Sequence, residues 1–193
     1  MKLLLTGFDV WGDRPYNSSW EIIKAPQLIL PEGWQCQSIQ LPVSWERVAQ
    51  VLMPHITPDV KAIVSFGMSG SKLVQVERIA VNLTGPTLQD CDGLFPSKEH
   101  VCDDGPPAYW TGLPYREIVS KLCVNGIEAA ENQFAGTYLC NFVFYTVMHH
   151  IATQRPDITG GFIHVPAFED RGGVERQALK SAVEILTQIM TRE

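Results

Sequence analysis

Short apolar runs alternate with amphipathic stretches along the whole chain. Apolar and β-branched runs predict strands over 3–6, 36–43, 60–66, 74–83, 127–132 and 161–165. Apolar residues at helical spacing predict helices over 17–25, 44–52, 115–124, 138–153 and 174–191. Strands that alternate with helices favour βαβ units around a mostly parallel sheet. We therefore expect a single α/β domain, residues 1–193, with helices on both faces of the central sheet.

One segment does not fit this alternation. Residues 84–114 are rich in Gly, Pro, Asp and Thr, and they are too many for a plain connection. Loops of this length in a compact domain are usually functional or mobile. We expect the segment to form either a lid or a subunit contact.

Composition narrows the class of protein. Hydrophobic residues make up 45% and charged residues 19% of the chain, as in ordinary globular domains. The formal net charge is −6 and no run of basic residues occurs, so nucleic acid is not an expected partner. No apolar run reaches the length of a membrane span. The opening MKLLLTGFDV is interrupted by Gly7 and Asp9, which favours a buried strand over a signal peptide.

The cysteines indicate a reducing compartment. There are five of them, widely spaced and without a C-x-x-C pair, which favours free thiols in the cytoplasm. Cys91, His100, Cys102 and Asp103 are close in sequence, but zinc sites usually show tighter ligand pairs. We expect no metal.

Cys140 is a candidate nucleophile. A Gly136–Thr137 turn follows a predicted strand, so Cys140 falls in the first turn of the next helix. The unpaired N–H groups and the positive end of the helix dipole stabilise a thiolate at such a position. The alternative is that Cys140 is a small buried apolar residue, as most cysteines are.

His164 and Glu77 are candidate partners of this thiol. His164 ends an apolar strand just before Pro166, where a general base can reach the edge of the sheet. Glu77 lies in an alternating apolar strand, where a carboxylate is costly unless paired, and a histidine N–H is one natural partner. Taken singly, His164 could equally be structural and Glu77 could face solvent.

Six short motifs occur in order along almost the whole chain: Thr6–Gly12, Asn17–Glu21, Glu77–Asn82, Gly105–Pro114, Ala135–Asn141 and Gly161–Pro166. They resemble T-G-F-x-x-F-G, N-P-S-x-E, E-R-x-A-x-N, G-P-x-A-Y with L-P, A-G-T-F-x-C-N and G-F-x-H-x-P. These are the motifs of the pyroglutamyl peptidase I (pyrrolidone-carboxylate peptidase) family of cysteine peptidases. Six ordered motifs are far more specific than any one of them.

The resemblance implies a fold, an activity and a site. The implied fold is a three-layer α/β sandwich with a twisted central sheet. The implied activity is removal of an N-terminal pyroglutamyl group from peptides by a thiol protease, without a cofactor. The family triad corresponds to Glu77, Cys140 and His164. Family members are cytoplasmic and commonly form homotetramers, so a homo-oligomer is expected. The implied substrate-binding residues are Phe8, Trp11, Asn17, Met68, Tyr138 and Leu139.

Two family positions are changed. Met68 stands where the family has a glutamine near the lactam. Thr87, ten residues after Glu77, stands where the family has an arginine. Loss of one oxyanion donor typically lowers the rate by about 10²–10³. Lys72 or a residue of segment 84–114 is the expected source of a replacement charge.

Three functional hypotheses follow from these departures. The first is an active pyroglutamyl peptidase. The second is a related cysteine amidohydrolase with a different N-acyl or lactam substrate, which Met68 and Thr87 motivate. The third is a binding protein on the same scaffold without useful turnover, whose thiol would show no selective alkylation.

Overall fold

A computed structural model describes residues 1–26, 28–168 and 176–192. The strands are β1 (Lys2–Phe8), β2 (Gln35–Leu41), β3 (Val60–Ser69), β4 (Val74–Glu77), β5 (Ile79–Val81), β6 (Ala108–Trp110), β7 (Ala129–Asn132) and β8 (Thr159–Pro166). The helices are α1 (Ser18–Glu21), α2 (Val48–Leu52), α3 (Tyr115–Val124), α4 (Leu139–Gln154) and α5 (Arg176–Met190), and a 3₁₀ turn η1 spans Met53–His55.

The centre of the fold is a six-stranded sheet in the order β2-β1-β3-β8-β4-β7. The first four strands in this order are parallel. Strands β4 and β7 are parallel to each other, but β4 is antiparallel to β8. The expected mostly parallel α/β sheet is therefore confirmed, with an inverted pair of strands at one edge.

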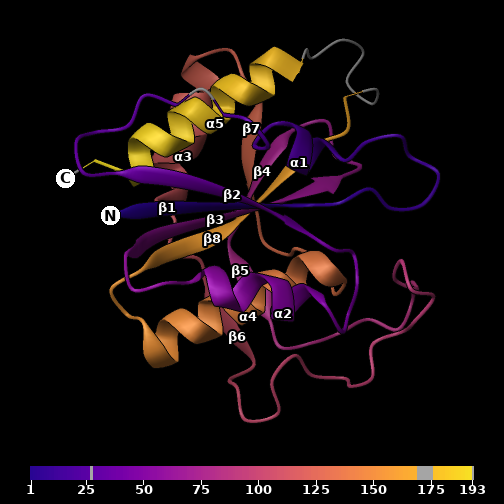
Figure 1. The fold of residues 1–193 in the computed structure, drawn as a ribbon. Coiled ribbons are helices and arrows are strands. Elements are labelled where there is room, and N and C mark those ends of the chain that lie inside the picture. Colours follow the sequence, from indigo (N-terminus) through magenta and orange to yellow (C-terminus); the bar gives the residue numbers. More distant parts are fainter. Residues whose placement is uncertain (27, 169–175, 193) are drawn as a thin grey trace.

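Helices cover both faces of this sheet. In Figure 1, α1, α3 and α5 lie above the sheet, and α2 and α4 lie below it together with the β5–β6 ribbon. The upper layer buries Ile22, Ile118 and Leu186 against the sheet. The lower layer buries Leu52 and Phe144 in a second cluster. Because both faces are covered, β3 is buried along most of its length, as its continuous apolar sequence predicts.

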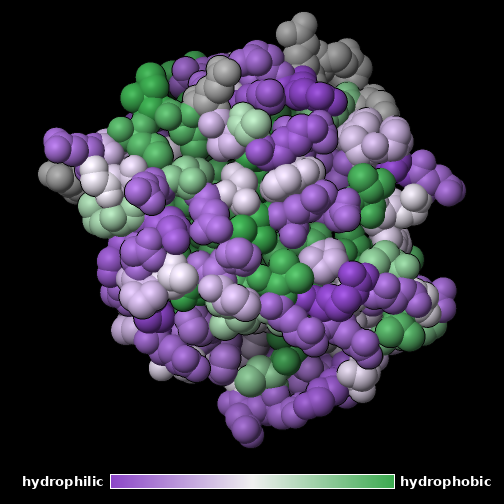
Figure 2. Space-filling view, in the orientation of Figure 1, coloured by the Kyte–Doolittle hydropathy of each residue, from purple (hydrophilic) through white to green (hydrophobic). Residues whose placement is uncertain are grey.

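The α5 side chains that pack into this upper layer are spaced as on one face of a helix, and they are Leu179, Ala182, Val183, Leu186, Ile189 and Met190. The predicted helix over 174–191 corresponds to α5, and its first two residues lie outside the described residues. The outer surface is different in character. The face drawn in Figure 2 is mostly hydrophilic, with apolar side chains in small separate groups.

The predicted strand over 74–83 is wrong as a single strand. It divides at Arg78 into β4, which joins the central sheet, and β5, which pairs with β6. At the division, the Arg78 N–H donates to the Asn132 carbonyl and the Arg78 carbonyl accepts from Thr111 N–H, both at 2.8 Å. The alternating pattern continues through this point because each half buries one face, although the two halves have different partner strands.

Two predicted helices are shorter than expected. The helix over 17–25 is reduced to α1 and a following turn, in which Lys24 N–H still donates to the Trp20 carbonyl. Pro26 disfavours helical backbone at Ala25, so the turn cannot continue. The helix over 44–52 starts as a turn, in which the Ser44 carbonyl accepts from Val48 N–H at 3.0 Å, and becomes α2 at Val48.

Segment 84–114 is held to the body of the protein at several points. It contains β6, and its Cys91 N–H donates to the Val43 carbonyl at 2.9 Å. The Tyr138 hydroxyl donates to the Gln89 carbonyl at 2.9 Å. These contacts fix the segment beside the start of α4, and its role as a lid or subunit contact stays a prediction. No helix in the described part of the chain is both long and apolar enough to cross a membrane.

Candidate active site

Cys140 lies in the first turn of α4. The chain reaches it through Gly136, whose φ of 81° is a conformation that favours glycine. Tyr138 is the N-cap residue, and no side chain caps the helix, so N–H groups of its first turn have no partner within the helix. The local sequence thus places Cys140 in the first turn of a helix that has no side-chain cap, and the first-turn position is as predicted.

His164 and Glu77 lie side by side in the sheet. The Nδ1 atom of His164 is 2.7 Å from Oε1 of Glu77. Glu77 is completely buried and the His164 residue is only 7% exposed, so water does not screen this pair. Cys140 is the second group that acts on the imidazole, and its influence on the pKa of His164 comes from charge and a side-chain hydrogen bond. The structure therefore brings the three predicted residues into one chain of contacts.

The charge state of His164 depends on both partners. Burial alone would lower the pKa of His164, because it disfavours the imidazolium. The Cys140 thiolate and the Glu77 carboxylate outweigh burial, through charge and hydrogen bonding, and raise the pKa of His164 from 6.5 to about 10. These electrostatics favour the imidazolium form of His164 at neutral pH.

Space for the sulfur comes from Gly67. This residue pairs with His164 across β3 and β8. A Cβ atom added at Gly67 would lie 2.8 Å from Sγ of Cys140 and equally close to the ring of Phe162. Distances below 3.0 Å are essentially never seen for a real Cβ atom, so only glycine leaves this position open to the thiol.

Asn132 is a residue of the site that sequence reasoning missed. Its Nδ2 donates to Oε1 and Oε2 of Glu77, at 3.1 and 3.0 Å. Asn132 ends β7, next to Glu77 at the end of β4. The sequence around Asn132 is typical of a polar strand end. Only the pairing of β4 with β7 shows that Glu77 is the partner of Asn132.

A pocket of about 240 Å³ opens beside Cys140. All six residues predicted to bind substrate line it: Phe8, Trp11, Asn17, Met68, Tyr138 and Leu139. Its other lining residues besides Cys140 are Arg14, Val43, Ser69 and Gly70, which were not predicted. Most of these side chains are apolar or aromatic, so the pocket suits a flat, uncharged ring.

The polar group of Asn17 is largely committed to the protein. Its Nδ2 donates to the Asp9 carbonyl at 2.9 Å, and its Oδ1 accepts from the backbone and side chain of Ser19. Asn17 therefore fixes the loop that carries Trp11, and one of its two amide hydrogens is left over for a ligand.

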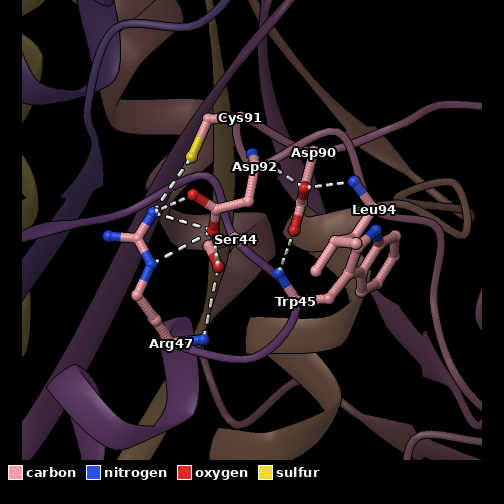
Figure 3. A network of polar contacts seen from close by, with 7 residues as sticks. All are labelled: Ser44, Trp45, Arg47, Asp90, Cys91, Asp92 and Leu94. Carbon is pink, nitrogen blue, oxygen red and sulfur yellow. Dashed lines mark hydrogen bonds and ion pairs between the residues drawn. The ribbon is translucent and has the colours of Figure 1, made fainter.

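The aromatic wall of the pocket is supported from behind. The ring of Tyr138 contacts Trp11, with centroids 5.6 Å apart, and meets Trp45 edge-on at 5.3 Å. Figure 3 shows how the Trp45 backbone is anchored by Asp90, whose Oδ2 accepts from Trp45 N–H at 2.9 Å. Oδ1 of the same buried carboxylate accepts from Asp92 and Leu94 N–H groups.

A second part of this network is exposed. Arg47 donates to both carboxylate oxygens of Asp92 and lies 3.2 Å from the sulfur of Cys91. Burial, first, and the charge of Asp92 raise the pKa of the Cys91 thiol, although Arg47 opposes them. Cys91 is thus a partner of Arg47 and not of the pocket. Among the described residues, no group of three or more His, Cys, Asp or Glu side chains could hold a metal ion.

The departures from the family pattern have clear positions. Met68 lines the pocket, whereas Thr87 is exposed on segment 84–114. Lys72, the expected source of a replacement charge, is exposed and does not join the described residues that line the pocket. Arg14 is the lining residue that carries a positive charge. Arg14 was not predicted, because it belongs to the pocket through the fold and not through a sequence motif.

Comparison with known proteins identifies one family. A family model described as pyroglutamyl peptidase matches residues 1–184. The pyrrolidone-carboxylate peptidase of Bacillus velezensis is 35% identical, over 98% of this chain and 88% of its own length. That of Bacillus subtilis is 36% identical, over 86% of this chain and 78% of its own length.

Solved structures give the same result. The crystal structure of pyroglutamyl peptidase I from Bacillus amyloliquefaciens has a TM-score of 0.88 and 31% identity, and the match covers 100% of this chain and 95% of that one. The pyrrolidone carboxyl peptidase of Thermococcus litoralis has a TM-score of 0.90 and 30% identity, covering 98% and 92% of the two chains.

Proposed function

This chain belongs to the pyroglutamyl peptidase family, and we propose that it removes N-terminal pyroglutamyl groups from peptides. The observation that carries the proposal is the run of contacts from Glu77 through His164 to Cys140 at an apolar pocket. A cysteine nucleophile needs a base, and the base needs an orienting group, which is the arrangement found here.

The roles follow from the contacts. Glu77 holds Nδ1 of His164, which fixes the tautomer and stabilises the imidazolium. His164 keeps Cys140 as the thiolate. The thiolate attacks the pyroglutamyl carbonyl, and the imidazolium then protonates the leaving amine. Water, activated by the neutral imidazole, releases pyroglutamate from the acyl-enzyme and restores the thiolate.

The charge that develops on the carbonyl oxygen needs donors. The backbone N–H of Cys140, in the uncapped first turn of α4, is the donor that we assign to this oxyanion. Phe8, Trp11 and Tyr138 enclose the lactam ring, with Asn17, Met68 and Leu139 completing the pocket. No step requires a metal or a cofactor.

Expected location and assembly are part of the same proposal. We propose that residues 1–193 form one domain that acts in the cytoplasm as a homo-oligomer, a dimer or a tetramer. The five free cysteines support a reducing compartment. Light scattering coupled to size-exclusion chromatography tests the assembly, and a monomeric mass at assay concentrations would contradict it.

The decisive experiment is hydrolysis of a fluorogenic pyroglutamyl amide with added reductant. We expect turnover by the wild type and none by Cys140→Ala. Cys123→Ala is the matched control, because Cys123 is an exposed thiol on α3 and its loss should leave the rate unchanged. Equal rates in wild type and Cys140→Ala would refute the assigned nucleophile.

A second candidate function is favoured by Met68. A methionine at the family glutamine position removes a polar partner of the lactam from the pocket. The chain could then be a cysteine amidohydrolase for another N-acyl or lactam substrate. This hypothesis requires that the protein does not cleave the pyroglutamyl amide but does cleave a member of a panel of N-acyl amides. It also requires selective alkylation of Cys140 by iodoacetamide at about pH 6. If iodoacetamide does not alkylate Cys140 selectively, a binding protein without useful turnover is favoured instead.

A further inference from the structure

We propose that Asn132 is a positioning residue that locks the carboxylate of Glu77 and thereby the ring of His164. This inference rests on the proposed function, because it assigns Asn132 a part in the same reaction. Asn132 does not touch the substrate pocket and acts only through Glu77.

Both N–H hydrogens of the Asn132 side-chain amide are used in hydrogen bonds. One side of the Nδ2 group faces both oxygens of Glu77, at 3.1 and 3.0 Å. The same nitrogen donates to the carbonyl of Phe134 at 3.0 Å. A primary amide has two hydrogens, so both are used. A flipped amide would place its oxygen against three acceptor oxygens, which fixes the orientation of the group.

Glu77 depends on this donor. The carboxylate is fully buried, and His164 binds only Oε1. Within the described part of the chain, Asn132 provides the hydrogen bond to Oε2. A buried carboxylate oxygen without a donor is costly, and the carboxylate can then rotate away from the ring. Because Asn132 is neutral, it holds Glu77 without weakening the negative charge that faces the imidazolium.

The fold places Asn132 between Glu77 and the approach to the nucleophile. Asn132 pairs with Glu77 in the parallel β4–β7 register, and its carbonyl accepts from Arg78 N–H at 2.8 Å. Phe134, the second partner residue of the side chain, begins the turn that leads to Cys140. One amide therefore ties the strand that carries Glu77 to the turn before the nucleophile.

The test compares Asn132→Ala and Asn132→Ser with the wild type and with Gln133→Ala. In metal sites, loss of a group that orients a metal ligand typically lowers activity by about 10–100-fold. We use the same range for Asn132, which orients Glu77. We expect that loss in kcat for Asn132→Ala, with KM changed by less than about threefold. Asn132→Ser keeps one donor and should recover part of the rate. Gln133 is the exposed neighbour and its replacement should change nothing.

The pH profile separates positioning from general damage. A misplaced Glu77 stabilises the imidazolium less, so the alkaline limb of kcat/KM should move to lower pH in Asn132→Ala. A merely less stable protein would lose amplitude without this shift. Wild-type kcat and an unmoved alkaline limb in a folded Asn132→Ala protein would overturn the inference.

An NMR titration of the His164 ring makes the test independent of turnover. If the wild type does not cleave pyroglutamyl amides, the proposed function fails. The inference on Asn132 is then decided by whether the pKa of His164 falls in Asn132→Ala. An unchanged pKa of His164 would overturn it, and a lower one would support it.

Discussion

The space that Gly67 leaves for the thiol can be tested by adding one methyl group. In Gly67→Ala the new Cβ would lie 2.8 Å from Sγ of Cys140 and 2.8 Å from the Phe162 ring. Non-bonded heavy atoms are most stable at about 3.5–4.0 Å. The sulfur and the ring must therefore both move by roughly 1 Å, because each is equally close to the new atom. The backbone of Gly67 is not in the left-handed region, so this crowding is the only cost of the change.

A displacement of this size should affect chemistry more than folding. Misplacement of a reacting group by about 1 Å can lower the rate by about 10²-fold. Overpacking of a core position typically costs about 1–3 kcal/mol of stability. We therefore expect Gly67→Ala to remain folded, with kcat for a fluorogenic pyroglutamyl amide reduced by about 10²-fold and slower alkylation of Cys140.

Gly160→Ala is the matched control. It lies on the neighbouring strand β8, and its Cβ would lie 2.6 Å from Cδ1 of Ile151, far along the strand from the thiol. It should lower the midpoint of urea unfolding in the same way and leave kcat close to that of the wild type. Near-wild-type kcat in Gly67→Ala, or an equal loss in Gly160→Ala, would refute the reasoning.

Three further predictions concern charge and hydrogen bonding. In Cys140→Ala the pKa of His164 should fall below its wild-type value, because burial, the largest influence, lowers it and the thiolate is lost; an NMR titration measures this. In the wild type, the stability that the protonated His164 ring contributes is fully present below about pH 6.5 and is lost as the pH rises through about 10. In the variant, this loss should occur at a lower pH. Asp90→Ala removes a buried carboxylate that accepts three backbone N–H groups. It should lower the free energy of unfolding in urea by about 1.5–3 kcal/mol or more. Asp92→Ala, at an exposed carboxylate, should lower it much less. Asn141→Ala should destabilise the protein by about 1–3 kcal/mol for each backbone group of Val81 and Leu83 left without a partner. Hydrogen exchange at β5 should speed up, and unchanged exchange would contradict this.

The sequence predicted the elements of the sheet better than their partners. Apolar runs located the central strands within a few residues, because burial on both faces leaves a local signal. The division of 74–83 at Arg78 was not predictable, since the two halves alternate alike and only their pairing differs. The short strand β6 was missed for a different reason, because three residues in a polar segment carry no periodicity.

The candidate site divides in a similar way. The expected positions of Cys140 and His164 followed from local rules, the first turn of a helix and the end of a buried strand. Asn132 and Arg14 gave no local signal, because the role of each depends on a neighbour distant in sequence. Asp90, which supports the pocket wall, lies in a segment whose composition indicated only a loop.

The position of β8 has a consequence for biosynthesis. Among the described residues it is the last strand to be made, yet it lies in the middle of the sheet, between β3 and β4. Until it emerges from the ribosome, both neighbours keep an open edge, which is the kind of surface that drives aggregation. At about 5–20 residues per second, the interval between completion of β4 and β8 is on the order of 5–20 seconds. Chaperone binding to nascent chains should therefore peak in this interval and end when residue 166 has left the exit tunnel.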